Sequence, residues 1–175
     1  MEGDLQMRIS RLSKDLKGFQ IISATDGQVI GKVEDVYIDL NNLHVAAIAT
    51  STGGLLTSKV EAIPRMDIKV WGEDVILAED PNVIKEGKSI QGFEEWESVS
   101  NQIKSKDVLN TKGEKIAELN DIVIDSEANI VGYDLSNVLI DGPVAESKRI
   151  NVNATKALGP DALIIDMSKL LKWEI

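Results

Sequence analysis

The sequence contains no cysteine, and it has only one histidine and seven aromatic side chains among 175 residues. Without cysteine the chain can form no disulfide, thiolate nucleophile, zinc-cysteine site or iron-sulfur cluster, and it is compatible with a reducing compartment. His44 is the only histidine, so no two histidines can act together in a site, and we expect it at a strand edge. We therefore predict no catalytic residue, no metal and no cofactor.

Basic segments and long apolar runs are also missing. The formal net charge is −10, with 29 acidic and 19 basic side chains, and the Lys and Arg residues form no run. Binding to phosphates needs a concentrated positive surface, so we expect no direct contact with nucleic acid. No segment approaches the roughly 18 to 20 apolar residues of a membrane span, and residues 1–10 lack the apolar core of a signal peptide. We expect a cytoplasmic protein, either free or peripheral to a membrane complex, with Met1 or Met7 as its native start.

The clearest positive feature is an internal repeat. The stretch from Thr25 to Asp39, TDGQVIGKVEDVYID, recurs from Thr111 to Asp125 as TKGEKIAELNDIVID, at a constant offset of 86 residues. Threonine, glycine, isoleucine and aspartate are identical at matching positions. Such a repeat predicts two related structural units.

The repeat and its surroundings have the pattern of short β-strands. Apolar residues are interleaved with charged ones from Val29 to Leu40, as in a half-buried strand, and Thr25-Asp-Gly27 has the composition of a tight turn. Similar strands follow at spacings of about 8 to 12 residues, and the long amphipathic helices of a two-layer α/β fold are missing. The sequence predicts a mostly β protein with two tandem small barrels and short helical segments at the linker and the C-terminus.

The repeat also sets the expected domain boundaries. We assign residues 7–80 to the first barrel and residues 98–168 to the second. Residues 81–97 are the expected linker, punctuated by Pro81, Gly87 and Gly92, and residues 169–175 are a C-terminal extension. Halves of roughly 85 residues are long enough to bury a core without disulfide or metal staples.

These motifs resemble the PRC-barrel family, named for the photosynthetic reaction centre. The family pattern joins a turn of the type D/E-G-x-x-I/L-G to a strand of the type V-x-D-V-x-I-D, and it closes with G-x-D-A/V-I/L-I-V. The first copy matches over residues 26–39 and 72–77, and the second over residues 113–125 and 159–164. The second copy has Ala117 for the second glycine and no proline matching Pro64. The resemblance implies two tandem barrels, similar to the cytoplasmic domain of the reaction-centre H subunit and to the protein-binding C-terminal domain of a ribosome-maturation factor.

Paired aspartates in the repeat are the first candidate site. Asp35 and Asp39, like Asp121 and Asp125, stand four residues apart, a spacing that on a helix would bring two carboxylates together for a metal ion. On a strand the same spacing separates them by about 13 Å, too far to share one ion. We expect these aspartates to flank turns in solvent, with a protein contact or a metal site as alternatives.

Aromatic residues are the second candidate site. Trp71, Phe93, Trp96 and Trp173 all lie at expected turns, in the linker or in the tail. A large ring at such a place either closes one end of a barrel or anchors a partner protein. We name these four residues as candidate protein contacts, with internal packing as the other interpretation.

The functional prediction is a non-catalytic protein-binding adaptor or an assembly or scaffold protein built from two PRC-like barrels, which could pack as an internal pseudo-dimer or form a homodimer. The resemblance implies a ribosomal, membrane-associated electron-transfer or division complex as the partner. The alternative is a sensor that binds a small molecule or an ion in the crevice between the barrels.

Overall fold

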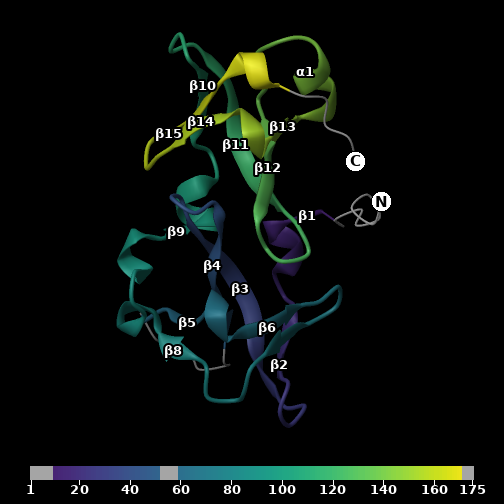
Figure 1. Cartoon of the computed structure of the whole chain (residues 1–175), viewed down its shortest axis with the longest axis vertical. Helices are drawn as coiled ribbons and strands as arrows, with labels where there is room; N and C mark the ends of the chain where they lie inside the picture. Colours follow the sequence, from purple (N-terminus) through teal and green to yellow (C-terminus); the bar gives the residue numbers. More distant parts are fainter. Residues whose placement is uncertain (1–9, 52–58, 171–175) are drawn as a thin grey trace, which may run out of the picture.

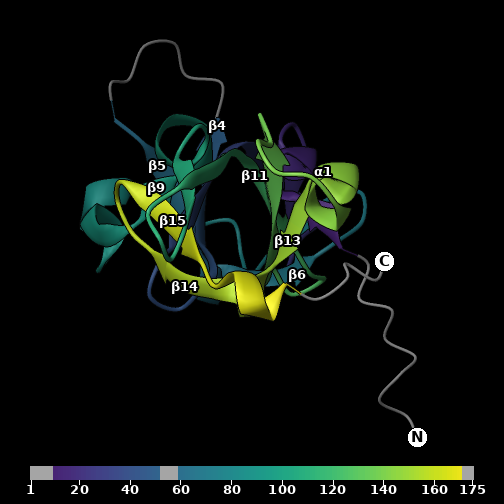
Figure 2. The same cartoon turned by 90° about the horizontal axis from the view of Figure 1, so that it is seen from above.

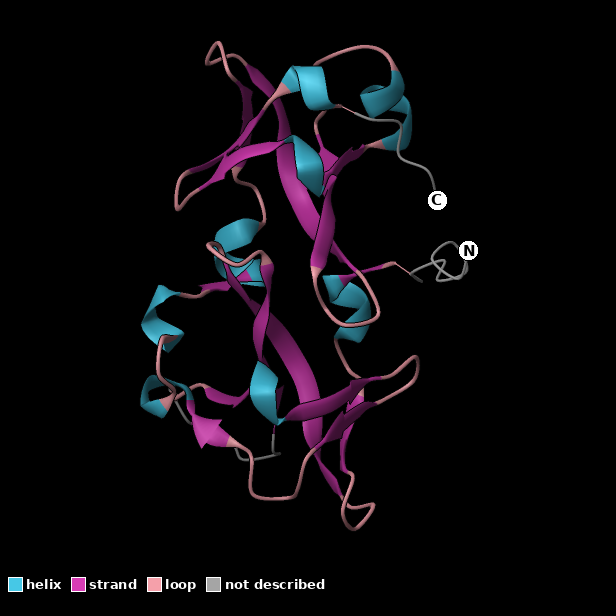
Figure 3. Cartoon of the chain, viewed as in Figure 1, coloured by secondary structure: helices cyan, strands magenta, loops and turns pink. Residues whose placement is uncertain are grey.

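The computed structural model describes residues 10–51 and 59–170, which form two β-sheets stacked along the long axis of the molecule (Figures 1 and 3). Strands dominate, and the helical segments are single turns, so the predicted mostly β fold is confirmed. Seen from above, the strands of the second sheet curl around a common axis (Figure 2). No helix within the described ranges is long and apolar enough to cross a membrane.

The first sheet contains β2 (Gln20–Ser23), β3 (Val29–Asp39), β4 (His44–Ser51), β5 (Glu61–Pro64), β6 (Ile68–Trp71), β7 (Ile76–Ala78), β8 (Lys85–Glu86) and β9 (Glu97–Ser98). The second contains β1 (Arg11–Leu12), β10 (Asp107–Asn110), β11 (Lys115–Ile124), β12 (Ile130–Ser136), β13 (Arg149–Asn151), β14 (Thr155–Leu158) and β15 (Ala162–Ile165).

The helical segments are the 3-10 turns η1 (Ser13–Leu16), η2 (Arg65–Asp67), η3 (Gly87–Ser89), η4 (Phe93–Glu95), η6 (Val152–Ala154) and η7 (Met167–Lys169), the π-helical turn η5 (Val99–Ile103) and the short α1 (Pro143–Ser147). As predicted, short helical segments lie in the linker region and near the C-terminus.

The two sheets have the same strand order. The first runs β6-β7-β2-β3-β4-β5 and continues to β8, and the second runs β14-β15-β10-β11-β12-β13. In each sheet one parallel pair, β2 with β7 and β10 with β15, lies among antiparallel pairs. Two stretches of sequence related by a repeat therefore follow one folding plan, which is consistent with two tandem PRC-like barrels. For brevity, the first unit is the sheet that contains β3, and the second unit is the sheet that contains β11.

The units exchange their opening segments. β1, which precedes the first unit in sequence, pairs with β11 of the second unit, whereas β9, which precedes the second unit, pairs with β3 of the first. We call residues 11–16 and 97–103 the lead-in segments. Because each lead-in completes the other unit's sheet, the two units are joined by backbone pairing in both directions.

The aspartate of the V-x-D-V motif has a local structural cause. β3 is bulged between Val33 and Asp35, and β11 is bulged between Leu119 and Asp121. A bulge interrupts the hydrogen-bond ladder and leaves backbone groups without a cross-strand partner. In both strands the aspartate supplies the acceptor, because the backbone N–H of the next residue donates to its Oδ1 at 2.8 Å in β3 and 2.7 Å in β11.

Each unit has a well-buried apolar core, and the cores are continuous across the interface. Ile21, Ile38 and Ile76 are fully buried in the first unit, as are Ile122 and Tyr133 in the second. Burial raises the pKa of Tyr133 to about 12, against a hydrogen bond between its hydroxyl and that of Thr155. A buried tyrosine with a hydroxyl partner is packed on its apolar face and satisfied at its polar end.

Candidate functional site

Asp35 and Asp121 bind the lead-in segments, a role that the sequence did not reveal. The Ser13 hydroxyl and the Lys14 backbone N–H of one lead-in donate to Asp121 of the second unit. The Ser98 and Ser100 hydroxyls of the other lead-in donate to Asp35 of the first unit. Each carboxylate therefore holds the bulge of its own strand and fastens the segment that arrives from the other unit.

The prediction of solvent-exposed aspartates is wrong for Asp121 and Asp125, each of which is only 2% exposed. Burial raises the pKa of Asp121, and hydrogen bonds from Ser13, Lys14 and Ile122 oppose that rise. The sequence prediction failed because spacing alone cannot show that a distant segment packs over the strand. The predicted turn-flanking role does hold for Asp39 and Asp125, whose Oδ1 atoms accept backbone N–H groups two residues later, from Asn41 and Glu127.

The two hairpin turns after the repeats also meet at the interface. The backbone N–H of Val45 donates to the carbonyl of Ala128 at 2.9 Å, and that of Ile130 donates to the carbonyl of Leu43 at 3.0 Å. The Arg65 guanidinium spans this contact, donating to the carbonyls of Val45, Ala128 and Glu127. Arg65 therefore links the first unit to the turn of the second.

His44 lies at the start of β4, as predicted for a strand-edge residue, and it pairs with Asn129 across the interface. Its Nε2 is 3.9 Å from Asp39 Oδ2. Burial and the positive charge of Arg65 lower the pKa of His44, and Asp39 only partly opposes them. Burial and Arg65 therefore favour the neutral imidazole, whereas Asp39 favours the charged one.

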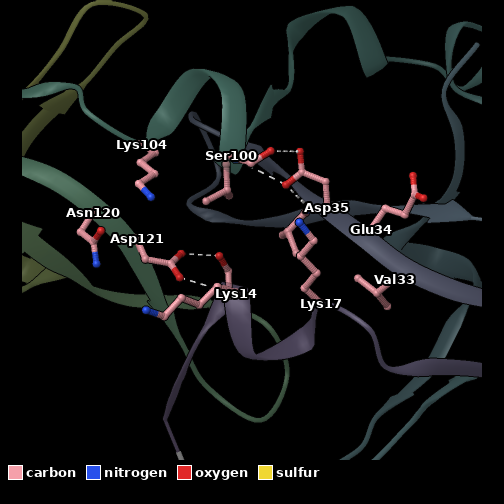
Figure 4. Close-up of a pocket in the computed structure, with 12 residues that line it drawn as sticks. Lys14, Lys17, Val33, Glu34, Asp35, Ser100, Lys104, Asn120 and Asp121 are labelled. Atoms are coloured by element: carbon pink, nitrogen blue, oxygen red, sulfur yellow. Dashed lines mark hydrogen bonds between the residues drawn. The ribbon is translucent and has the colours of Figure 1, made fainter. Parts of the chain in front are cut away.

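A pocket of about 220 Å³ lies between the units. Residues of both copies line it, including the matching pairs Asp35 with Asp121 and Glu34 with Asn120, together with Lys17 and Lys104. Figure 4 shows Asp35 and Asp121 facing the pocket across from one another, with Lys104 and Lys17 beside them. The pocket therefore lies where the two copies face each other with related residues.

A second, larger cavity is an open groove of about 740 Å³ on the first unit. Its apolar lining includes Pro64, Met66, Ile68, Ile90 and Trp96, which come from β5, η2, β6 and the linker. Met66 is 81% exposed, the highest value among the large exposed apolar side chains of the described residues. We call this feature the Met66 groove.

The structure places the predicted aromatic residues in different settings. Phe93 packs against Tyr37 with ring centroids 4.8 Å apart and meets Trp96 edge-to-face at 6.1 Å. Trp71 packs on the apolar core, and its carbonyl accepts from Arg11 at 3.3 Å. Trp173 lies outside the described residues. Only Trp96 lines the Met66 groove, and a contact role for any of the four stays a prediction.

The sequence did not single out Met66 or Arg65. Met66 stands between a charged pair, Arg65 and Asp67, just after Pro64. A large apolar residue flanked by charges in a polar stretch is a weak sign of an exposed anchor. The described part of the chain holds no group of three or more acidic or histidine side chains that could bind a metal ion.

Comparison with known families agrees with this geometry. Residues 10–83, which span β1 to β7, match the family model of the PRC-barrel domain. This segment is a PRC-barrel domain. No curated protein matches the chain. PRC-barrel domains often act as protein-interaction modules, and the second unit, which lies beyond the matched segment, has the strand order of the PRC-barrel domain.

Proposed function

We propose that this chain is a non-catalytic protein-binding adaptor or scaffold, in which two PRC-like barrels at about residues 7–80 and 98–168 form one body around the 81–97 linker. Its partner would be another protein or a complex in the cytoplasm or at the surface of a membrane. The duplicated fold supports this proposal because Asp35 and Asp121, the matching aspartates of the V-x-D-V motif, hold the two units together.

The single observation that carries the proposal is the Met66 groove. A concave site lined mainly by apolar side chains, with a few charged groups among them, is the usual form of a binding site. Met66 stands 81% exposed at a hollow that Trp96 also lines. Tryptophan and methionine are enriched at protein interfaces, since the first buries a large area and the second adapts to the partner's shape.

Affinity purification from the native host tests the proposal. The bait is the full chain, compared with Met66→Asp, and the control is Leu139→Asp, because Leu139 is another exposed apolar side chain, 66% exposed, on the second unit. We expect a specific partner to be lost with Met66→Asp and retained with Leu139→Asp. The same set of captured proteins with all three baits would refute a role for the groove.

A second candidate function rests on the pocket between the units. A cavity of about 220 Å³ with three lysines on its wall could hold a small ligand. Because both units line the cavity, binding there would depend on how the units are joined. A ligand that binds only the folded state raises the unfolding temperature. A thermal-shift screen of metabolites and ions should give a hit whose shift disappears in Lys104→Ala if the chain is such a sensor, and none if it is only an adaptor.

A further inference from the structure

The charged residues of the Met66 groove have the opposite sign to the chain as a whole. The chain carries ten more acidic than basic side chains. Among the described residues that line the groove, however, the charged side chains are Arg65 and Lys85, and there is no Asp or Glu. The groove is therefore a cationic, apolar hollow on an acidic protein.

The charge of Arg65 is held in place but is not neutralised by a contacting carboxylate. Its guanidinium donates to three backbone carbonyls and, at 3.2 Å, to Asn129 Oδ1, all of them neutral acceptors. These bonds fix the side chain beside the groove. The carboxylates of Asp125 and Glu127 lie near enough to offset part of its charge, but neither lines the groove, where the guanidinium remains a fixed cation.

Lys85, at the start of β8, is the second cation of the groove. Its Nζ is 3.3 Å from Asp67 Oδ2, with about half of the lysine side chain exposed. An exposed pair of this kind contributes little, so an incoming carboxylate can compete for the ammonium group. Lys85 can therefore form an ion pair with a carboxylate of a ligand, whereas Arg65 contributes a fixed positive charge beside the groove.

We propose that the Met66 groove binds a short segment of a partner protein in which a large apolar side chain stands next to Asp or Glu. The apolar residue would pack against Met66, Ile90 and Trp96, and the acidic residue would lie near Lys85 and Arg65. This inference rests on the proposed adaptor function and specifies its partner. A groove of about 740 Å³ is in the size range of sites that bury several side chains of a ligand.

Charge complementarity favours this occupant over a basic one. A basic segment would meet Arg65 and Lys85 at the groove, where like charges cost affinity. Arg65 and Lys85 attract an acidic segment at the groove, whereas the acidic side chains on the rest of the surface repel it. Its binding should therefore be restricted to the groove. That restriction gives specificity through repulsion elsewhere as well as through attraction in the groove.

Selection from a random library of 12-residue displayed peptides tests the inference on the full chain. Enriched peptides are synthesised with a fluorophore, and their Kd is measured by anisotropy for the wild type, Met66→Asp and Lys85→Glu. Leu139→Asp and Lys112→Glu are the matched controls, because both residues are exposed and lie outside the groove. Thermal unfolding of each variant shows that it is folded, as expected for changes at exposed positions.

We expect the enriched peptides to share an apolar residue flanked by Asp or Glu. Met66→Asp and Lys85→Glu should each weaken their binding at least tenfold, and the controls should leave it unchanged. Replacing the peptide's acidic residue with Lys should abolish binding to the wild type and restore part of it to Lys85→Glu. Raising the salt concentration should weaken wild-type binding.

Two other outcomes separate this inference from the proposed function. If the enriched peptides are neutral or basic but still depend on Met66, the acidic partner chemistry is wrong and the docking role of the groove stands. If no peptide is enriched, or if binding ignores both groove variants, neither the partner chemistry nor the docking role of the groove holds.

Discussion

Asp121 joins the two units through hydrogen bonds to its buried carboxylate. Its carboxylate accepts from the Ser13 hydroxyl, from the Lys14 backbone N–H at 3.0 Å and from the Ile122 backbone N–H at 2.7 Å, and it is almost fully buried. An amide in its place has only one acceptor oxygen, so its N–H₂ group would face a donor. A buried donor that loses its acceptor costs about 1–3 kcal/mol.

We therefore predict that Asp121→Asn lowers the free energy of unfolding by about 1–3 kcal/mol, measured by urea denaturation. Asp35→Asn should cost less, because Asp35 is only half-buried. Asp161→Asn at an exposed position is the control and should change stability by less than about 0.5 kcal/mol. Equal effects at positions 121 and 161 would show that the Asp121 contacts do not stabilise the fold.

His44 should make stability depend on pH. Burial lowers its pKa in the folded chain below the ordinary value of 6.5. The unfolded chain then binds a proton more readily than the folded one, so stability is full above the unfolded pKa and is lost as pH falls from about 7 through 6.5 toward the folded value. His44→Gln should show a shallower loss of stability between pH 7 and pH 5 in thermal unfolding. Identical slopes for the two proteins would contradict this prediction.

At the residue scale the sequence predicted the turn roles of Asp39 and Asp125 but not the buried role of Asp121. Turn roles follow from neighbours along the chain, such as the Asn41 and Asn42 amides that bond Asp39. The partner of Asp121 is Ser13, which is 108 positions away. A contact at that distance in sequence leaves no local pattern.

At the scale of elements, the two closing hairpins allow a matched test. Gly72 and Gly159 precede β7 and β15 at corresponding places of the family motif, and neither has a positive φ. A Cβ on Gly72 would be 2.4 Å from the carbonyl oxygen of Val75, whereas a Cβ on Gly159 would have Ala162 O at 4.0 Å as its nearest neighbour. Only the first hairpin requires the close backbone approach that glycine permits.

We predict that Gly72→Ala destabilises the protein by about 1–3 kcal/mol, because the backbone must move to relieve the overlap. Gly159→Ala should be neutral or stabilising by up to about 1 kcal/mol, because alanine restricts the unfolded chain and meets no clash. Chemical denaturation of the two variants beside the wild type gives both values. A loss at position 159 as large as that at position 72 would mean that the close approach does not decide the outcome.

The strands and their repetition were predictable, but the exchange of the lead-ins was not. Alternating apolar residues and Gly or Asn turns place most strands within a residue or two, and the offset of 86 shows that the two sheets share a plan. β1 and β9 have two residues each, too few for a periodic pattern. Only packing decides which sheet such a short strand joins.

For the molecule as a whole, the two units are related but not interchangeable. At one lead-in Arg11 lies over the Phe19 ring at 5.6 Å and donates to the Gly72 carbonyl. At the other, Glu97 forms a buried ion pair with Lys106 at 2.5 Å, and Lys106 donates to the Gly159 carbonyl. If residues 11–16 and 97–103 traded places, Arg11 would take the position of Glu97, and two cations, Arg11 and Lys106, would lie close together. These contacts therefore favour the observed arrangement of the two copies.

The overall shape also explains why the Met66 groove escaped prediction. Its walls come from β5, β6 and the linker, and they meet only when the linker folds back over the first unit. The sequence indicated linker aromatics as contact residues, and one of them, Trp96, lies in the groove. Met66 lines the same groove as Trp96, and its exposure could be recognised only from the folded structure.

The central claim is that the reciprocal lead-ins make the two units one body. The most direct measurement uses the full chain with a protease site inserted between the exposed Gln91 and Gly92, cut after folding and passed over a size-exclusion column with light scattering. The exchanged β1 and β9 should hold the cut halves together, so we predict a single particle with the mass of the uncut chain. Two separate folded particles of about half that mass would contradict the claim.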